Sequence, residues 1–147
     1  MTQNLVAIII SVFSLVITTV LAIIQIVTSN RNNAHYLQAN LIKEMYEKTL
    51  MSSIPSGLEY IRYDGRKITG VEKLIFAVCE IRRVSLYFKA TDRCYYDNVH
   101  DKCQKLEIFL SEATRDYTPT EFAEFMNRVD EEVNKLFMMI SKKYAGK

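Results

Sequence analysis

The sequence lacks charge at its N-terminal end. No charged residue occurs before Arg31, so all 19 Lys and Arg and all 17 Asp and Glu lie in the rest of the 147-residue chain. The net charge of +2 gives no strong nucleic-acid footprint, because a committed nucleic-acid-binding protein usually shows a concentrated basic face. A Gly-rich phosphate loop, a nucleophile elbow, an HExxH motif and an ordered catalytic triad are also missing. The two histidines leave few options for acid–base catalysis.

Cysteine is also scarce, and the three residues Cys79, Cys94 and Cys103 form no paired framework. An odd number without such a framework fits a reducing compartment. Cys94, His100 and Cys103 suggest zinc, but Cys79 or an acid would have to supply the fourth ligand, and no CxxC knuckle exists. The sequence therefore favours small buried thiols, and we expect neither a metal nor another cofactor.

The uncharged N-terminal stretch contains an apolar run at residues 5–27. At about 1.5 Å per residue it spans roughly 34 Å as a helix, enough to cross a hydrocarbon core of about 30 Å. Soluble cores rarely need so long an apolar run. A cleaved signal peptide would need a basic leader and a small-residue cleavage site, and neither is evident. We predict that residues 1–30 form a single transmembrane anchor.

The basic residues near the anchor indicate its orientation. Arg31, Lys43 and Lys48 follow the span, and no basic side chain precedes it. Under the positive-inside rule this arrangement favours a short N-terminus outside the cell and a cytosolic C-terminal domain.

Polar residues recur within the apolar run at intervals of seven. The series, with Ser14 three residues after its second member, consists of Asn4, Ser11, Ser14, Thr18 and Gln25. On a helix this spacing places them in one narrow stripe, here named the polar stripe. Two interpretations stay open. The residues are ordinary membrane Ser and Thr in a chance register, or the stripe faces other copies of the chain, bonding helix to helix or lining a wet pore.

The remainder of the chain has helical periodicity throughout. Residues 31–57 are predicted to form a stalk helix and a linker: the stalk continues the transmembrane helix as far as Met51, and the linker is SSIPSG (52–57). After a short helical piece at 58–63, the segment 64–70 is expected to be a loop. Apolar residues at gaps of three and four predict helices over 71–89, 92–114 and from Thr118 to about Gly146. Thr118, Pro119 and Glu121 fit the start of the last helix, with Glu121 completing a capping box.

These patterns define the expected fold class. The chain should be all-α, with residues 58–147 forming a cytosolic bundle of four to five helices. Short links between the predicted helices favour antiparallel neighbours.

One pair of residues is a candidate for catalysis. Arg93 and His100 are seven positions apart on one predicted helix, with Asp97 nearby. An arginine could bind a phosphate while a neutral histidine moves a proton during attack by an RNA 2′-hydroxyl. The simpler interpretation, which we favour, is an Arg93–Asp97 surface pair with a histidine at the edge of the bundle.

This region of the sequence resembles the HEPN superfamily of small helical bundles. Ribonuclease members carry an Arg, four to six further residues and then a His at a dimer interface, and Arg93–x6–His100 has the upper spacing. Cys94 stands where the family often has a polar residue. The resemblance implies a HEPN-like bundle, with Arg93 and His100 as its candidate catalytic residues in a metal-independent endoribonuclease.

The whole architecture, one N-terminal span joined to a small HEPN-like domain, resembles the membrane accessory protein of type VI-B CRISPR systems. This resemblance implies a ring-shaped pore of identical subunits in the bacterial inner membrane that depolarises the membrane in antiviral defence. Its implied partners are the bilayer, further copies of the chain and an RNA-guided ribonuclease effector or RNA. No small-molecule substrate is evident. The alternatives are a membrane-tethered ribonuclease and a membrane-anchored adaptor that only localises a partner.

Overall fold

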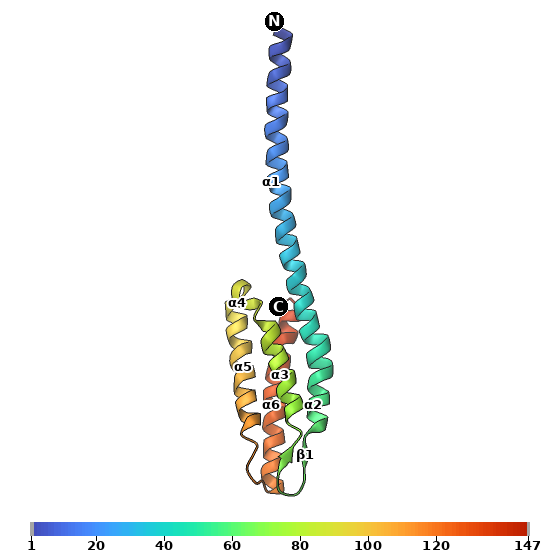
Figure 1. Ribbon diagram of the computed structural model, residues 1–147, viewed down its shortest axis with the longest axis vertical. Coiled ribbons are helices and arrows are strands. Elements are labelled where there is room, and N and C mark those ends of the chain that lie inside the picture. Colours follow the sequence, from blue (N-terminus) through green and yellow to red (C-terminus); the bar gives the residue numbers. More distant parts are fainter. Residues whose placement is uncertain (1, 147) are drawn as a thin grey trace. The chain divides into compact units, whose positions relative to one another are not determined.

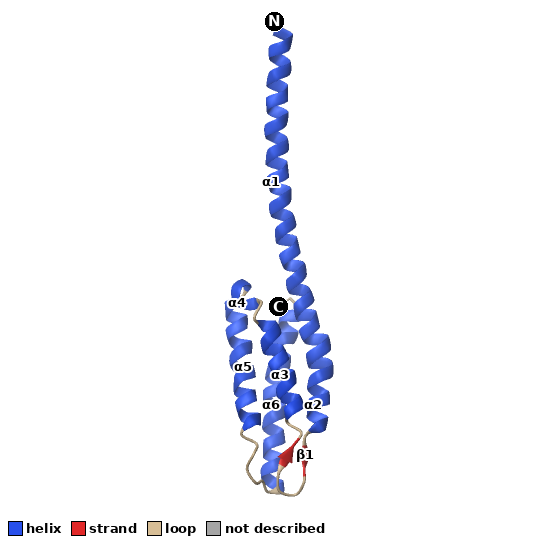
Figure 2. Cartoon of the chain, in the orientation of Figure 1, coloured by secondary structure: helices blue, strands red, loops and turns tan. Residues whose placement is uncertain are grey.

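The structure, a computed structural model, describes residues 2–146, and it describes side chains from residue 11 onward. Nearly all of the described chain is helical, with one short hairpin (Figure 2). The chain divides into two compact units, Met1–Ala39 and Asn40–Lys147. The all-α prediction is therefore confirmed for the described residues, with the hairpin as its exception.

The first unit consists of helix α1 (Thr2–Glu44) up to Ala39. From Ser11 onward this helix is long and apolar enough to cross a membrane, and none of its most apolar stretch is buried. Its large apolar side chains, such as Phe13 at 65% and Leu15 at 69%, are exposed. So exposed an apolar surface is costly in water and suited to lipid.

The second unit is a bundle of antiparallel helical segments (Figure 1). Its elements after α1 are η1 (Met45–Ser53), α2 (Ile54–Tyr60), β1 (Arg62–Tyr63), β2 (Ile68–Thr69), α3 (Glu72–Ser85), α4 (Phe88–Thr91), α5 (Arg93–Ser111) and α6 (Pro119–Tyr144). Helix α3 packs against α2 and α5, and α5 packs against α6. The predicted antiparallel order of the helices is confirmed.

The core of the bundle contains many of the apolar residues whose gaps of three and four predicted the helices α3, α5 and α6. The fully buried ones include Leu74, Val78 and Ile81 of α3, Val99, Cys103, Leu106 and Leu110 of α5, and Val129, Leu136 and Ile140 of α6. Phe125 of α6 is also buried, whereas the adjacent Met126, which the spacing of Phe122 and Val129 predicts for the core, is only half-buried.

The predicted linker at 52–57 is wrong, because the chain stays helical there. The segment η1 is a π-helix, and α2 follows it directly, with Pro55 just after the point where the π-helix gives way to the α-helix. The second half of the predicted stalk also differs from expectation. Met45, Leu50 and Ile54 lie in the core of the bundle instead of outside it.

The expected loop at 64–70 contains most of a two-stranded hairpin. Strand β1 pairs antiparallel with β2, with Tyr63 opposite Ile68. Asp64 Oδ1 accepts hydrogen bonds from the backbone N–H groups of Arg66 and Lys67, at 2.9 and 2.6 Å. Gly65 has a φ of 93°, a conformation that suits glycine.

The predicted start of the last helix is confirmed in detail. Thr118 Oγ1 accepts from the Glu121 backbone N–H at 3.3 Å, and Glu121 Oε2 accepts from the Thr118 backbone N–H at 2.8 Å. This reciprocal pair is a capping box.

Candidate functional site

The polar stripe lies on α1, and the structure describes the side chains of all its members except Asn4. Ser11, Ser14, Thr18 and Gln25 are all exposed on the described helix, whereas the side chain of Asn4 lies outside the described residues. The helix is continuous through this region, so the seven-residue interval keeps these residues on one side. Each heptad turns the stripe by about 20° relative to a straight helix, a drift that a left-handed supercoil removes.

The hydroxyl of Thr18 is bonded within its own helix. Thr18 Oγ1 donates to the Ser14 carbonyl at 2.6 Å, and Thr19 Oγ1 donates in the same way to the Leu15 carbonyl at 2.7 Å. A Thr that bonds to its own backbone is tolerated in lipid without a partner helix. The hydroxyl oxygen of Thr18 keeps acceptor capacity toward a neighbouring helix.

Gln25 is the member of the polar stripe that is most costly to place in hydrocarbon. Its amide carries two N–H donors and a carbonyl acceptor, more hydrogen-bonding capacity than a hydroxyl. In hydrocarbon such a group is costly unless it finds a partner or lies near the interface.

Arg93 and His100 lie on one side of α5, about 10 Å apart along its axis. The Arg93 side chain is 77% exposed, and its Nε lies 3.7 Å from Asp97 Oδ2. His100 is half-buried, with its ring centroid 5.4 Å from that of Tyr96. The structure thus contains the surface pair that we favoured, and the catalytic role of Arg93 and His100 stays a prediction.

The three thiols are free and lie in different environments. Cys103 is buried, and burial raises the pKa of its thiol to about 12. Cys79 is half-buried, and burial followed by its hydrogen bond to Glu107 raises its pKa. Cys94 is exposed, against the expectation of a buried thiol. Within the described part of the chain, no group of three or more His, Cys, Asp or Glu side chains is placed to hold a metal ion.

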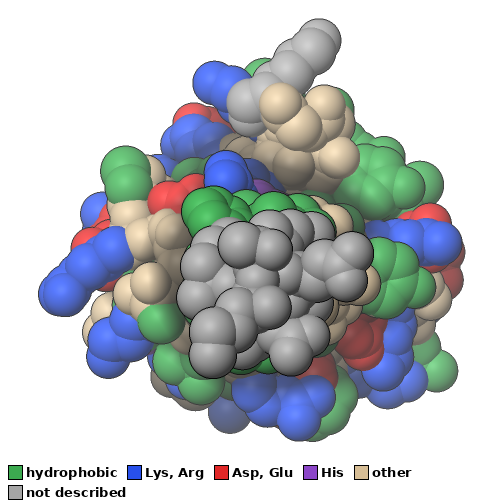
Figure 3. All heavy atoms as spheres, turned by 90° about the horizontal axis from the view of Figure 1, so that it is seen from above, with side chains coloured by type: hydrophobic (Ala, Val, Ile, Leu, Met, Phe, Trp, Pro, Cys, Tyr) green, Lys and Arg blue, Asp and Glu red, His purple; other side chains and the backbone are tan. Residues whose placement is uncertain are grey.

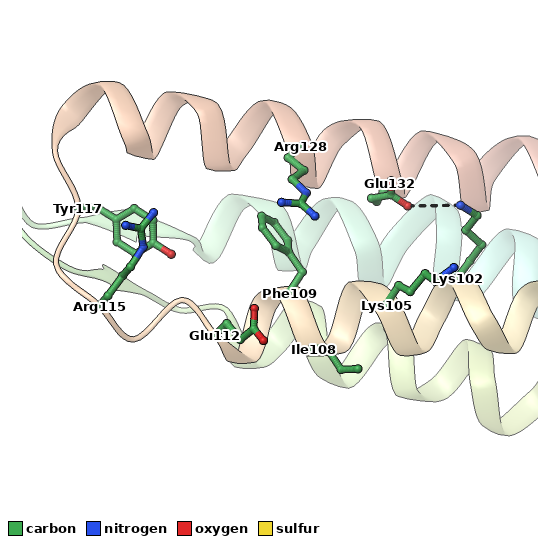
Figure 4. A pocket seen from close by; sticks show the side chains of 9 residues that line it. All are labelled: Lys102, Lys105, Ile108, Phe109, Glu112, Arg115, Tyr117, Arg128 and Glu132. Atoms are coloured by element: carbon green, nitrogen blue, oxygen red, sulfur yellow. Dashed lines mark ion pairs between the residues drawn. The ribbon is translucent and has the colours of Figure 1, made fainter.

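The structure also gathers cations that the sequence analysis does not single out. A groove between α5 and α6, with a volume of about 520 Å³, is lined by Lys102, Lys105, Arg115 and Arg128 (Figure 4). These residues follow no short motif, so the only signal in the sequence is the antiparallel pairing of the two helices that contain most of them.

Comparison with known proteins adds no assignment. No protein-family model, curated protein or solved structure matches this chain.

Proposed function

We propose that the protein is a membrane-anchored effector that self-associates through the polar stripe into a ring or pore and depolarises the membrane when activated. The observation that carries this proposal is Gln25, an exposed amide in line with Ser11 and Thr18 on a long apolar helix. A single anchor has no use for such a line of polar groups, whereas a ring of helices hides it from lipid.

The physical argument rests on the difference between Gln and Thr in hydrocarbon. Thr18 already has a hydrogen bond to its own helix, so it gives little drive for association. The Gln25 amide, two residues before the end of the apolar run, has no comparable bond to its own helix within the described part of the chain, and it is proposed to bond a partner helix on the side of the membrane nearer the bundle. Such interhelical bonds contribute about 0.5–2 kcal/mol each in membranes. Repetition around a ring multiplies that contribution and leaves the remaining polar groups facing a wet centre.

The orientation and setting belong to the same proposal. Arg31, Lys43 and Lys48 support a cytosolic bundle with a short N-terminus outside, in a bacterial inner membrane. An RNA-guided ribonuclease effector, or RNA itself, is the proposed activating partner in antiviral defence, a role suggested by the resemblance to the CRISPR accessory family.

Replacement of stripe residues by Leu tests the proposal. Ser11→Leu, Thr18→Leu and Gln25→Leu combined should abolish depolarisation, measured with a potential-sensitive dye in cells in which the partner system is triggered. Thr19→Leu is the matched control, because Thr19 has the same intrahelical bond as Thr18 but lies about 100° away around the helix. Unchanged depolarisation and assembly in the triple variant would remove the pore-lining role.

The adaptor alternative is separated by a swap of the anchor. An unrelated single span in place of residues 1–30 should preserve function in an adaptor and destroy it in a pore.

A second candidate function is a membrane-tethered HEPN-type ribonuclease. Its support is the exposed guanidinium of Arg93, paired with Asp97 at 3.7 Å, on the same side of α5 as His100. Purified protein should then cut RNA without added metal, and Arg93→Ala and His100→Ala should each abolish cutting. Wild-type protein that never cuts RNA would rule this function out.

A further inference from the structure

Four basic side chains line the groove between α5 and α6 along its length. Lys105 and Arg115 lie toward opposite ends in Figure 4, and Arg128 lies between them. Two carboxylates, Glu112 and Glu132, also line the groove. Two more carboxylates pair with lining cations from beside the groove, Asp101 with Lys105 at 2.8 Å and Glu121 with Arg115 at 3.1 Å. These pairs lie at the surface, where an ion pair contributes little, so a multiply charged anion can replace the carboxylates.

Arg128 is the best placed of these cations. Its guanidinium carbon lies 4.4 Å from the centroid of the Phe109 ring, so the ring covers one face of the planar group. Within the part of the chain that the structure describes, no carboxylate lies within 4.0 Å of its nitrogens in an ion pair. An arginine stacked in this way keeps its N–H edge for bidentate binding of a phosphate.

One carboxylate of the groove itself, that of Glu132, is already neutralised by two lysines. Glu132 pairs with Lys102 at 3.8 Å and with Lys135 at 2.7 Å. Its carboxylate therefore offers little repulsion to an incoming anion.

The far end of the groove is held by the hairpin and its loop. The Arg115 guanidinium carbon lies 4.7 Å from the Tyr117 ring centroid. The Tyr117 carbonyl accepts a hydrogen bond from the Tyr63 hydroxyl at 2.8 Å, and the Tyr117 N–H donates to the Arg66 carbonyl at 2.8 Å. These bonds fix the backbone beside Arg115, so this end of the groove is preformed.

We propose that the α5–α6 groove binds a small ligand that carries a chain of phosphate groups, such as a nucleoside triphosphate or inorganic tripolyphosphate. Arg128 and Lys105 are its principal phosphate ligands, and Arg115 binds the far end. The volume of about 520 Å³ is of the size typical for small-molecule sites. Cations spread along the groove match several linked phosphates better than a single one.

A small ligand fits the charge distribution better than a nucleic acid does. Within the groove the lining cations are interspersed with the carboxylates Glu112 and Glu132, so they form no continuous basic track, and the end of the molecule seen in Figure 3 also shows basic and acidic side chains mixed. Binding along a polynucleotide needs such a track. This site goes beyond the proposed function, because self-association of the anchor requires no phosphate ligand.

The test is calorimetric titration of the full-length protein, solubilised in a phosphate-free maltoside detergent, with ATP, tripolyphosphate and a single-stranded RNA. We expect saturable binding of one ATP or tripolyphosphate per chain. Arg128→Gln and Lys105→Gln should each weaken it about tenfold or more, the usual effect of losing a charge-assisted hydrogen bond. Both side chains are exposed at the surface, so the fold should persist, and circular dichroism checks this.

Arg83→Gln is the matched control. Arg83 is an exposed arginine of α3, paired with Glu80 and outside the groove, so this variant should bind ATP as the wild type does. Equal binding of ATP and tripolyphosphate identifies the phosphate chain as the ligand, and tighter binding of ATP adds a contribution from the nucleoside. The proposal is overturned by the absence of saturable binding of both, by binding of RNA alone, or by equal weakening in Arg83→Gln.

Discussion

The contact between α2 and α3 gives the sharpest prediction for the bundle. Gly57 is buried in α2, and a Cβ added there would lie 2.9 Å from Leu74 Cα and 3.0 Å from Leu74 N. Both are backbone atoms of α3, so a rotamer change at Leu74 cannot relieve the clash. Gly57→Ala must therefore push the two helices apart.

Two opposing terms decide the magnitude of the effect. Ala is better than Gly in a helix by about 1 kcal/mol. Overpacking of a close contact costs about 1–3 kcal/mol, and contact with rigid backbone places this case toward the upper end. We therefore expect Gly57→Ala to lower the free energy of unfolding by about 1–2 kcal/mol. Ser56→Ala, at the exposed neighbouring position, should instead raise it by about 0.5 kcal/mol or less.

Urea denaturation of the full-length protein in detergent measures both variants. Near-ultraviolet circular dichroism of the tyrosines follows the bundle, because the apolar part of α1 contains no tyrosine. Opposite signs for two alanine substitutions at adjacent positions would establish the close approach of α2 and α3. If Gly57→Ala were at least as stable as Ser56→Ala, the reasoning from the Leu74 backbone would be refuted.

Three further predictions concern the capping box of α6, the pair of Asp92 with Lys143, and the cysteine thiols. Thr118→Ala removes half of the capping box and should cost about 1 kcal/mol of stability, and an unchanged urea midpoint would count against the cap. The Lys143 hydrogen bond at 2.6 Å holds the pKa of Asp92 below its usual value. The stability from this pair is therefore complete above the unfolded pKa of about 3.9 and is lost as the pH falls through the lower folded pKa. In Asp92→Asn, the free energy of unfolding should therefore fall less steeply between pH 5 and pH 2 than in the wild type. An equally steep fall in the variant would show that other carboxylates cause it. Because Cys94 is exposed and the buried Cys103 has a pKa of about 12, maleimide should modify Cys94 in the folded protein and Cys103 only after unfolding, as mass spectrometry can show; equal rates would contradict the burial.

The helices of the bundle could be predicted because each has one apolar face with regular spacing. Leu74, Val99 and Val129 stand in such stripes, and all three are fully buried. The start of α6 could be predicted equally well, because Thr118 and Glu121 form its capping box within one turn of helix. Local interactions of this kind are encoded in a few adjacent residues.

The irregular region between α1 and α3 could not be predicted, because its outcome depends on tertiary contacts. Pro55 and Gly57 are ordinary signals for a turn. Here Pro55 follows directly on the π-helix, and Gly57 is required by the close approach of α3. The same two residues thus stay within a helix because a second helix packs against them.

The α5–α6 groove could be predicted only in part from the sequence. Its parts are distant in sequence, yet one antiparallel register places Lys102 beside Glu132 and Phe109 beside Phe125. That register is fixed by the short connection after α5 and by the cap that starts α6. A displacement of α6 by one turn would move Arg128 away from Phe109 and remove the stacked guanidinium. The groove is therefore a consequence of the loop and the cap, and a change that loosens the Thr118 cap should weaken phosphate binding as well as stability.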